Sequence, residues 1–307
     1  MPLGPAQRAC VDAFVARSRF RSCGAVVTDL DGTAVHEVEG RVGISAAVES
    51  GLARIYAAER PVVVNSLRFP LSVIRTFGAD WYRIAAAPIP TVCLNGSTIG
   101  RVVKSADGAL AFEEIEAYPL LPDELREVLA GVRGLLEAGA DDLLLFAYPR
   151  DWRAGEILWT PRRERVPGLV RKYPSAARVD ASEYAALEER LLAAPHCMLF
   201  LLIDAPEDRL MAYQHTKRSQ FVTHAGVDKL FGAQRIAEQL GVDLSHSVGA
   251  GDTDLDTFLQ GVGLAVVVGP HAIELRGRAE TLRVRDPLEF GEVLARLADV
   301  AEEATSC

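Results

Sequence analysis

The sequence predicts an α/β fold in which a doubly wound parallel sheet forms a core and an α+β domain is inserted into it. At both ends of the 307-residue chain, short apolar runs typical of fully buried strands alternate with helical segments. This alternation stops in the first half of the chain and resumes in the second half, and the segment between has a mixed order. We therefore expect a leader helix within residues 1–22, a core formed by residues 23–97 and 217–307, and an inserted domain at residues 98–216.

The first part of the core is predicted from apolar runs and from helix-start signals. Ser45 is a good N-cap residue, and Pro70 suits the first turn of a helix. The expected elements are a leader helix at 7–20, a strand at 24–29, a helix at 45–60, a strand at 61–65, a helix at 70–77 and a strand at 91–94.

The inserted domain and the last part of the core follow from the same signals. The Asp107-Gly108 pair predicts a hairpin turn. In the insert we expect strands at 101–104 and 109–112, a helix at 122–137, a strand at 142–148, a helix at 183–193, and strands at 197–204 and 209–214. In the core we then expect a helix at 229–240, a strand at 247–251, a helix at 255–261, a strand at 264–268, a helix from His271 and a helix at 286–301.

Composition and charge exclude several classes of protein. The chain is 49% hydrophobic, which suffices for a packed core, and its net charge of −9 argues against nucleic acid as the main partner. It contains no run of about 18 apolar residues and no signal-peptide pattern, so we expect no membrane partner. The five cysteines are scattered, which favours reduced thiols in the cytoplasm. The leader helix could pack on its own chain or against a second copy, so both a monomer and a homodimer are compatible with the sequence.

Two carboxylates follow the first predicted strand. Residues i and i+2 of a strand point to the same side, so Asp29 and Asp31 could face one crevice. Two carboxylates this close repel each other unless a cation lies between them or one of them holds a proton. Paired oxygens suit Mg²⁺, and a carboxylate can also attack phosphorus. An ordinary surface turn at Asp31-Gly32 is the alternative.

Three further motifs also lie at the ends of strands or the beginnings of helices, where open α/β sheets bind their ligands. Ser66 follows the strand at 61–65, and Lys229 begins the helix at 229–240. The third motif is Gly249-Ala-Gly-Asp252-Thr-Asp254-Leu-Asp256, at the end of the strand at 247–251.

In their order along the chain these motifs resemble those of the haloacid dehalogenase-like (HAD) hydrolases. The spacing from Lys229 to Asp252 and the insertion between the second and third motifs resemble the type IIB branch with a large α/β cap. That branch includes the Cof-like sugar phosphatases and the mannosyl-3-phosphoglycerate phosphatases. Asn95-Gly96 and Ile44-Ser45 match two further features of the branch. The resemblance spans residues 24–302 and implies a Rossmann-like core with an inserted cap.

The resemblance implies a role for each motif residue. Asp29 would attack phosphorus to form an aspartyl phosphate, and Asp31 would act as the general acid and base. Ser66 would donate a hydrogen bond to the phosphoryl group, and Lys229 would neutralise its charge and orient the nucleophile.

The resemblance also implies a Mg²⁺ site. The ligands would be Asp29, Asp252 and the main-chain carbonyl of Asp31, because Mg²⁺ is normally held by one or two carboxylates, water and a phosphate oxygen. Asp256, expected one helical turn after Asp252, would support Lys229 or a metal-bound water.

Two positions depart from the pattern of the branch. Leu67 stands where the branch has the glycine of Thr-Gly-Arg, and it adds bulk where glycine allows close approach. Leu255 stands where the branch usually has asparagine. Both departures indicate an outlying substrate preference or a modest rate.

An arginine- and tryptophan-rich segment of the cap is the candidate specificity element. It comprises Tyr148, Arg150, Trp152, Arg153, Trp159, Arg162, Arg163 and Arg165. Arginine binds phosphate and carboxylate, and tryptophan stacks on sugar rings. The alternative is a solvated arginine-rich loop whose tryptophans pack in the core of the cap. The candidate substrate-binding residues are Arg68, Asn95, Arg150 and Arg153.

These observations predict a cytoplasmic, Mg²⁺-dependent phosphatase of a small phosphorylated metabolite, with a sugar phosphate as the first candidate. Two alternatives remain open at this stage. One is a phosphomutase of the same branch, which would return the phosphoryl group to a sugar. The other is a non-catalytic ligand-binding or regulatory protein on the same fold, which Leu67 and Leu255 motivate.

Overall fold

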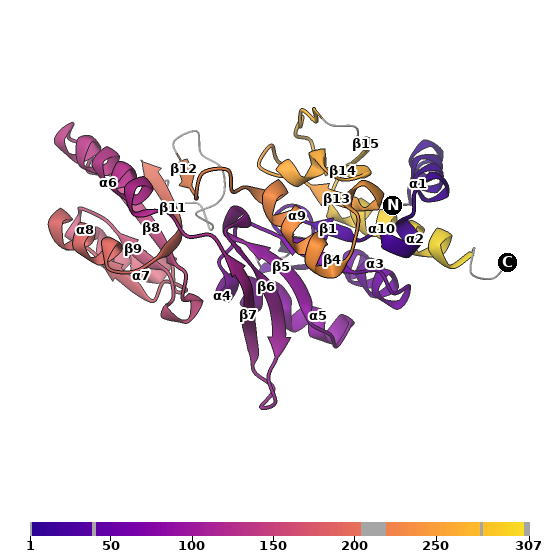
Figure 1. The fold of residues 1–307 in the computed structure, drawn as a ribbon, viewed down its shortest axis with the longest axis horizontal. Helices are drawn as coiled ribbons and strands as arrows, with labels where there is room; N and C mark the ends of the chain where they lie inside the picture. The colour runs from indigo at the N-terminus through magenta and orange to yellow at the C-terminus, as the bar shows by residue number, and fades with distance from the viewer. Residues whose placement is uncertain (1, 39–40, 204–218, 277–278, 304–307) are drawn as a thin grey trace. The chain divides into compact units, whose positions relative to one another are not determined.

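The computed structural model describes residues 2–38, 41–203, 219–276 and 279–303. The chain forms two compact units (Figure 1). The first unit comprises Met1–Ser66, Val73–Glu116 and Asp228–Cys307, and the second comprises Leu67–Ser72 and Ala117–Val227.

An eight-stranded sheet forms the centre of the first unit, with the strand order β15-β14-β13-β1-β4-β5-β6-β7. The strands from β15 to β5 are parallel to one another, and β6 pairs antiparallel with β5. Their bounds are β1 (Val26–Thr28), β4 (Val62–Asn65), β5 (Ile89–Cys93), β6 (Thr98–Lys104), β7 (Leu110–Ala117), β13 (Val248–Gly251), β14 (Leu264–Val268) and β15 (Glu280–Val284). Because β13, β1 and β4 are parallel neighbours, their carboxyl ends meet at one edge of the sheet.

Helices flank this sheet, as the doubly wound prediction requires. Helix α10 packs against α3 and α1, whereas α9 packs against β4, β5 and β6. The helices are α1 (Pro5–Arg17), α2 (Phe20–Cys23), α3 (Ala46–Ala57), α4 (Pro70–Val73), α5 (Ala79–Ile84), α9 (Lys229–Leu240) and α10 (Pro287–Glu303), with a π-helical turn at Ile74–Gly78 and 3-10 turns at Leu94–Gly96, Leu244–His246 and Thr257–Gln260. A separate antiparallel pair is formed by β2 (Val35–Val38) and β3 (Arg41–Ile44).

The second unit contains a five-stranded sheet with the order β10-β9-β8-β11-β12. Helices α6 and α8 lie side by side and bury apolar side chains against one face of this sheet (Figure 1). The elements are α6 (Pro122–Glu137), β8 (Leu143–Pro149), β9 (Ile157–Trp159), α7 (Val166–Lys172), β10 (Arg178–Asp180), α8 (Tyr184–Leu192), β11 (His196–Ile203) and β12 (Ser219–Val222), with 3-10 turns at Trp152–Ala154 and Arg163–Arg165.

Most predicted elements are observed, with limits that shift by a few residues. The helix at 122–137 forms over the same residues. Ser45 caps α3 as expected, because its side chain accepts a hydrogen bond from the amide of Val48 at 3.3 Å. The sequence prediction missed the short strands β2, β3, β9, β10, β12 and β15. In β15 a signal was present, since the alternating residues Leu282 and Val284 are buried.

The structure places the predicted hairpin in the core sheet and not in the insert. β6 pairs with β5 from Cys93–Thr98 to Ile89–Val102, and β7 lies beside β6 at the edge of the sheet. An Asp-Gly hairpin can join any open sheet edge, and β5 offers the nearest one along the chain. The second unit therefore runs from Ala117 to Val227, with Leu67–Ser72 added, where we had expected residues 98–216.

Two predicted helices do not form. Only a 3-10 turn, Thr257–Gln260, occupies the segment expected to be helical at 255–261, and residues 271–276 have no regular structure. In the first case the side chain of Asp256 accepts hydrogen bonds from the amides of Asp252 and Thr253 and holds the segment as a turn. The strand predicted at 209–214 lies outside the described residues.

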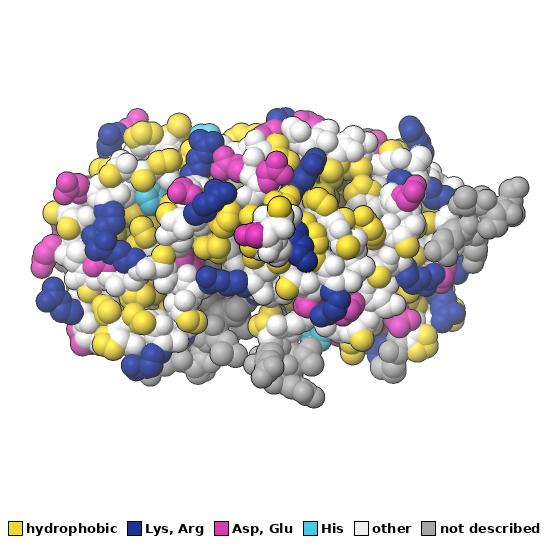
Figure 2. Space-filling view, turned by 90° about the horizontal axis from the view of Figure 1, so that it is seen from below, with side chains coloured by type: hydrophobic (Ala, Val, Ile, Leu, Met, Phe, Trp, Pro, Cys, Tyr) yellow, Lys and Arg dark blue, Asp and Glu magenta, His cyan; other side chains and the backbone are white. Residues whose placement is uncertain are grey.

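The surface carries mixed charges. On the face shown in Figure 2, cationic and anionic side chains are interspersed. Among the helices that the described residues form, none is both long enough and apolar enough to cross a membrane.

The contact between α3 and α10 depends on a glycine. A Cβ added at Gly51 would lie 2.6 Å from the Cβ of Leu294 and 2.9 Å from the carbonyl oxygen of Gly291. Both distances are shorter than van der Waals contact, so the two helices would have to move apart. By contrast, Gly134 in α6 is exposed, and a Cβ there would meet no atom within 4 Å among the described residues.

We expect Gly51→Ala to lower the free energy of unfolding by about 1–3 kcal/mol through overpacking. The control Gly134→Ala should raise it by up to about 1 kcal/mol, because alanine has the higher helix propensity. Urea unfolding followed by circular dichroism measures both changes. A Gly51→Ala protein as stable as the wild type would contradict the close packing of α3 on α10.

Candidate active site

Three polar residues come directly after three neighbouring parallel strands. Asp29 follows β1, Ser66 follows β4 and Asp252 follows β13. The pairing of β1 with β13 extends past the strand, because the amide of Asp29 donates to the carbonyl of Ala250 at 2.9 Å. The structure thus confirms that the three predicted motifs begin at one edge of the sheet, where α/β folds bind ligands.

Lys229 reaches this edge from the first residue of α9. The helix begins there because the side chain of Asp228 caps it, accepting a hydrogen bond from the amide of Phe231 at 2.8 Å. The Nζ of Lys229 donates to Oδ1 of Asp29 at 2.7 Å and to Oδ1 of Asp256 at 2.6 Å. With only 2% of its surface exposed, Lys229 is a buried cation held between two carboxylates.

Asp256 makes further hydrogen bonds through its second oxygen. Its Oδ2 accepts from the amides of Asp252 at 2.9 Å and Thr253 at 3.1 Å. Asp256 is 1% exposed, so both of its oxygens are used inside the protein. The expected support of Lys229 by Asp256 is observed, but a turn and not a helix brings the two residues together.

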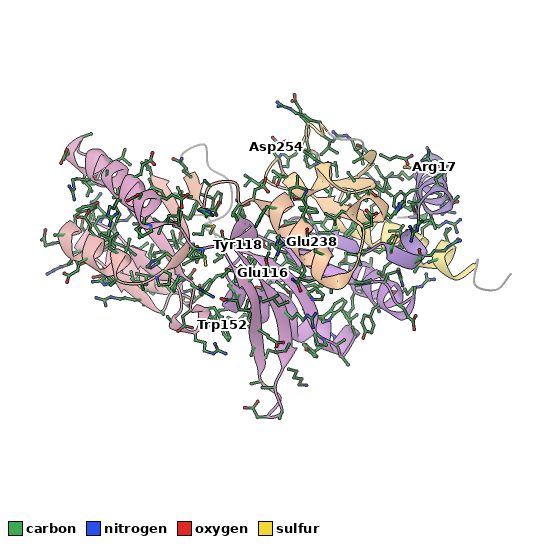
Figure 3. The ribbon with its side chains drawn as sticks, viewed as in Figure 1. Arg17, Glu116, Tyr118, Trp152, Glu238 and Asp254 are labelled. Atoms are coloured by element: carbon green, nitrogen blue, oxygen red, sulfur yellow. The ribbon has the colours of Figure 1, made fainter. Side chains whose placement is uncertain are left out.

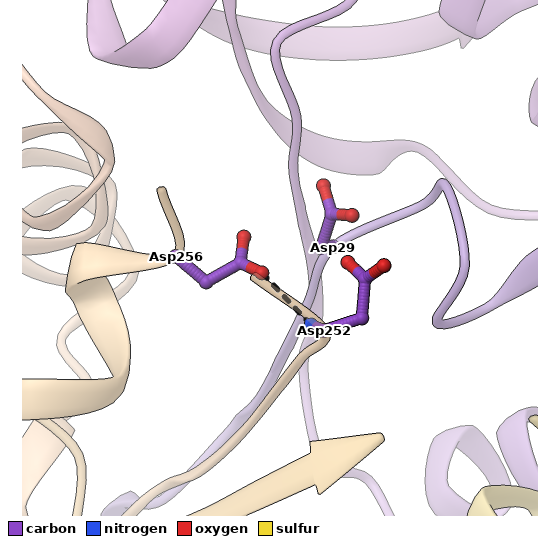
Figure 4. Close-up of side chains that lie close together, drawn as sticks. All are labelled: Asp29, Asp252 and Asp256. Carbon is purple, nitrogen blue, oxygen red and sulfur yellow. Dashed lines mark hydrogen bonds between the residues drawn. The ribbon is translucent and has the colours of Figure 1, made fainter. Parts of the chain in front are cut away.

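Three carboxyl groups converge at this point (Figure 4). One oxygen each of Asp29, Asp252 and Asp256 lies within 4.8 Å of the others, an arrangement that could hold a metal ion. The sequence predicted Asp29, Asp252 and the main-chain carbonyl of Asp31 as the metal ligands. The observed acidic group shares Asp29 and Asp252 with that set and also contains Asp256, which we had not expected as a ligand.

The side chain of Asp31 does not belong to this acidic group. Strand β1 ends at Thr28, so the alternation that would have aligned Asp29 with Asp31 does not extend to residue 31. Asp31 instead forms an isolated bridge with Val35 and is half-buried. It still lies close enough for its charge to raise the pKa of both Asp29 and Asp252.

Burial and like charge dominate the electrostatics of the site. Burial is the main cause that raises the pKa of Asp29 well above its usual range, while Lys229 acts to lower it and the neighbouring carboxylates raise it again. Burial, followed by the charge of Asp256, raises the pKa of Asp252 to about 7. For Lys229, burial acts to lower the pKa, but Asp256 and Asp29 outweigh it and raise the pKa, so the lysine stays charged.

This donor set fits a divalent cation. Asp29, Asp252 and Asp256 carry three negative charges when ionised, and Lys229 supplies one positive charge, so the site has an excess of negative charge. Because Asp256 already accepts hydrogen bonds at both oxygens, Asp29 and Asp252 are the better ligands. Gly32, at φ 75°, leaves room for Asp252, since a Cβ there would overlap its Oδ2. Hard carboxylate oxygens of this kind suit Mg²⁺.

The candidate substrate-binding residues fall into both units. Asn95 lies in the first unit, where its amide donates to the carbonyl of Ser66 at 3.4 Å, and it has a left-handed backbone at φ 56°. Arg68 lies in the second unit and is buried, with Nη1 donating to Oγ of Ser72 at 3.1 Å. Arg150 and Arg153 are exposed residues of the second unit.

The tryptophans of the second unit are packed in its interior. Trp159 is 1% exposed and donates its indole N–H to the carbonyl of Ser182 at 3.0 Å. Trp152 is buried under the guanidinium group of Arg153, 4.5 Å from its ring centre. The alternative in which both tryptophans pack within the domain is therefore confirmed. Two of the nearby arginines form surface ion pairs, Arg162 with Glu164 and Arg165 with Asp142.

Sequence reasoning missed two residues that position Lys229. One is the helix cap Asp228, although an Asp before a helical run is a recognised start signal. The other is Thr257, whose Oγ1 accepts a hydrogen bond from the amide of Leu230 at 3.0 Å. No local pattern marks Thr257, because its partner is 27 residues away.

Comparison with known proteins relates this geometry to solved structures. No family model and no curated protein sequence matches the chain. It is similar in structure to a phosphatase of the haloalkanoate (HAD) enzyme superfamily from Bacteroides thetaiotaomicron, with 18% identity, a TM-score of 0.62, and 91% of this chain and 96% of that chain covered. It is also similar in structure to a HAD subclass IIB sugar phosphatase, with 16% identity and a TM-score of 0.63. The match covers 89% of this chain and 97% of that chain.

A third similar structure comes from Plasmodium vivax and is described as a HAD/Cof-like hydrolase. Its identity is 13% and its TM-score 0.68, and 94% of this chain and 99% of that chain are covered. At such identities the likeness establishes the fold. The chain therefore has the HAD fold of a Rossmann-like core with a cap, as the sequence predicted.

We expect Lys229→Met to lower the free energy of unfolding by about 3–5 kcal/mol, because two buried carboxylates lose their cation. Methionine keeps most of the side-chain volume, so the loss reports the charge. The control Lys104→Met changes an exposed lysine of β6 and should alter stability by about 0.5 kcal/mol at most. Urea unfolding measures both variants, and equal stability of the two would argue against a buried ion triad at Lys229.

Proposed function

We propose that this chain is a Mg²⁺-dependent phosphatase of the HAD superfamily that hydrolyses the phosphate monoester of a small metabolite. The observation that carries the proposal is the buried Lys229, which bridges Asp29 and Asp256 beside Asp252 at the carboxyl edge of the sheet. A sugar phosphate is the substrate class that we favour, because the motifs resemble the sugar phosphatases of the type IIB branch.

Asp29 is the nucleophile in this proposal. Its Oδ1 accepts the hydrogen bond from Lys229, which leaves Oδ2 to attack phosphorus. A bond forms between Oδ2 and phosphorus, the bond from phosphorus to the ester oxygen breaks, and Asp31 donates a proton to the leaving oxygen. Water then attacks the aspartyl phosphate, Asp31 takes its proton, and inorganic phosphate and free Asp29 result.

Lys229 and Ser66 supply positive charge and hydrogen bonds to the phosphoryl group. Lys229 also acts to lower the pKa of Asp29 against the larger effect of burial, and so favours the ionised form of the nucleophile. Its position is determined before the substrate binds, because both of its carboxylate partners belong to the same unit. Such preorganised charges stabilise a transition state at no cost of reorganisation.

Asp29, Asp252 and the main-chain carbonyl of Asp31 would hold Mg²⁺. The ion would offset the negative excess of the site and the charge of the transferring phosphoryl group. Asp256 keeps a supporting role, since both of its oxygens already accept hydrogen bonds.

The arrangement of Lys229 between Asp29 and Asp256 also bears on the two alternatives, a non-catalytic binding protein and a phosphomutase. A binding protein does not need a nucleophile held by a buried lysine, so the ion triad favours catalysis over the non-catalytic alternative. A phosphomutase would use the same residues and would depend on a bisphosphate activator. The described residues of the first unit are common to both reactions, and we propose hydrolysis because the motifs resemble those of the type IIB sugar phosphatases.

The setting that we propose is the cytoplasm, with a small phosphorylated molecule as the partner and with neither nucleic acid nor membrane involved. The described cysteines Cys10, Cys23, Cys93 and Cys197 are not joined in disulfides, which suits a reducing compartment. The net charge of −9 would repel a nucleic acid backbone.

We expect wild-type protein with Mg²⁺ to hydrolyse p-nitrophenyl phosphate and Asp29→Asn to reduce the rate to background. Asp31→Asn should lower kcat by about 10²–10⁴-fold, the usual contribution of a general acid and base. The matched control is Asp254→Asn, on the exposed loop after β13 (Figure 3), which should leave kcat unchanged. Equal rates for wild type and Asp29→Asn would refute the proposed nucleophile.

We expect Mg²⁺ to stabilise the wild type and Asp254→Asn, but not Asp252→Asn. A ligand at about 100 times its dissociation constant raises the free energy of unfolding by about 2.7 kcal/mol. Thermal unfolding with and without Mg²⁺, with EDTA as the reference state, measures the effect. Stabilisation of Asp252→Asn to the wild-type extent would place the ion elsewhere.

A further inference from the structure

Asn65 is a buried polar residue at the end of an otherwise apolar strand. Strand β4 consists of Val62, Val63, Val64 and Asn65, and Asn65 is 0% exposed. Its Nδ2 donates a hydrogen bond to the main-chain oxygen of Lys229 at 2.8 Å. Its Oδ1 is also buried and accepts no hydrogen bond from any residue that the structure describes.

Stability alone does not explain an asparagine at this position. An unsatisfied buried acceptor carries a desolvation penalty that can exceed the net gain from one hydrogen bond. A fourth valine would continue the apolar strand without that penalty, since the residues before Asn65 show that the strand accommodates valine. The one hydrogen bond from Nδ2 to Lys229 is what the asparagine provides and a valine would not.

That hydrogen bond connects two motifs of the proposed active site. Asn65 is joined by a peptide bond to Ser66, and its side chain holds the residue that carries the catalytic ammonium group. A side-chain hydrogen bond thus connects the end of β4 directly to the beginning of α9. Both segments belong to the first unit.

Other contacts also hold the beginning of α9, and one of them reaches Ser66 through the main chain of Asn95 and Gly96. The amide of Leu230 donates to Thr257 at 3.0 Å, which ties α9 to the turn after Asp256. The carbonyl of Asp228 lies so close to Gly96 that a Cβ there would overlap it. Asn65 supplies the side-chain hydrogen bond from β4.

We propose that Asn65 is a positioning residue, which acts through Lys229 and Ser66 to set the distance between the two groups that bind the transferring phosphoryl group. This inference rests on the proposed phosphatase function. Misplacement of a catalytic group by about 1 Å can cost about 10²-fold in rate, so loss of the hydrogen bond should affect the chemical step.

The test compares two variants of Asn65 with a matched control. Asn65→Ala removes the hydrogen bond and the volume, whereas Asn65→Leu removes the hydrogen bond and keeps a side chain of similar shape. The control is Thr91→Val on the neighbouring strand β5, opposite Val64. Thr91 is also 0% exposed, and its hydroxyl group donates a hydrogen bond to the carbonyl of Ile89 at 2.9 Å, which is not a residue of the proposed site.

We expect both Asn65 variants to lose about 10–100-fold in kcat for p-nitrophenyl phosphate with little change in KM, and Thr91→Val to keep the wild-type kcat. The inhibition constant of orthovanadate, which mimics the trigonal-bipyramidal transition state, should rise in the Asn65 variants by about the same factor as kcat/KM falls. The inhibition constant of inorganic phosphate should change far less. All assays are made well below each variant's melting midpoint. A loss of kcat caused by unfolding is thereby separated from a loss caused by misplacement of Lys229.

Wild-type kcat in both Asn65 variants would overturn the inference, and so would an equal loss of kcat in Thr91→Val, which would indicate a general effect of the sheet. Inactive wild-type protein would overturn the phosphatase proposal and this inference with it. An active wild type with active Asn65 variants would overturn this inference alone.

Discussion

The bridge from Lys229 to Asp29 and Asp256 is the interaction on which the rest of the site depends. Two carboxyl groups can be buried side by side only if a cation compensates them or one of them holds a proton, and burial alone would favour the neutral lysine. Lys229 stays charged because of its two carboxylate partners, and in turn it acts to lower the pKa of Asp29. The three residues come from the end of β1, the beginning of α9 and the turn after β13, so the bridge requires all three segments to be correctly placed.

The charges around the bridge do not cancel, so the side chains of the site alone leave an excess of negative charge. One lysine faces three converging carboxylates, and the pKa of Asp252 is raised to about 7 as a result of burial and of the neighbouring negative charge. A phosphate ester is itself an anion and would be repelled by such a site. A divalent cation would remove both difficulties, because it would compensate the carboxylates and attract the phosphate.

Apolar runs in the sequence indicate where buried strands end. The fold, and the polar residues that follow these strands, could therefore be predicted from the sequence. Asp29, Ser66 and Asp252 each follow an apolar run, and parallel pairing brings the ends of these runs together. The relation of Asp29 to Asp31 was not predictable, because it depends on β1 ending at Thr28. Nor could the sequence show which sheet the hairpin of β6 and β7 would join, since that depends on the open edge of β5.

In the proposed phosphatase, the site in the first unit would determine the reaction class but not a particular ester. Its charged groups are already paired with one another, as Asp256 shows with both oxygens accepting hydrogen bonds from within the unit. Groups satisfied in this way can recognise only what all phosphate monoesters share, the phosphoryl group. On this proposal, selection among esters would come from residues outside the ion triad, and Leu67, which departs from the type IIB pattern, is not part of that triad.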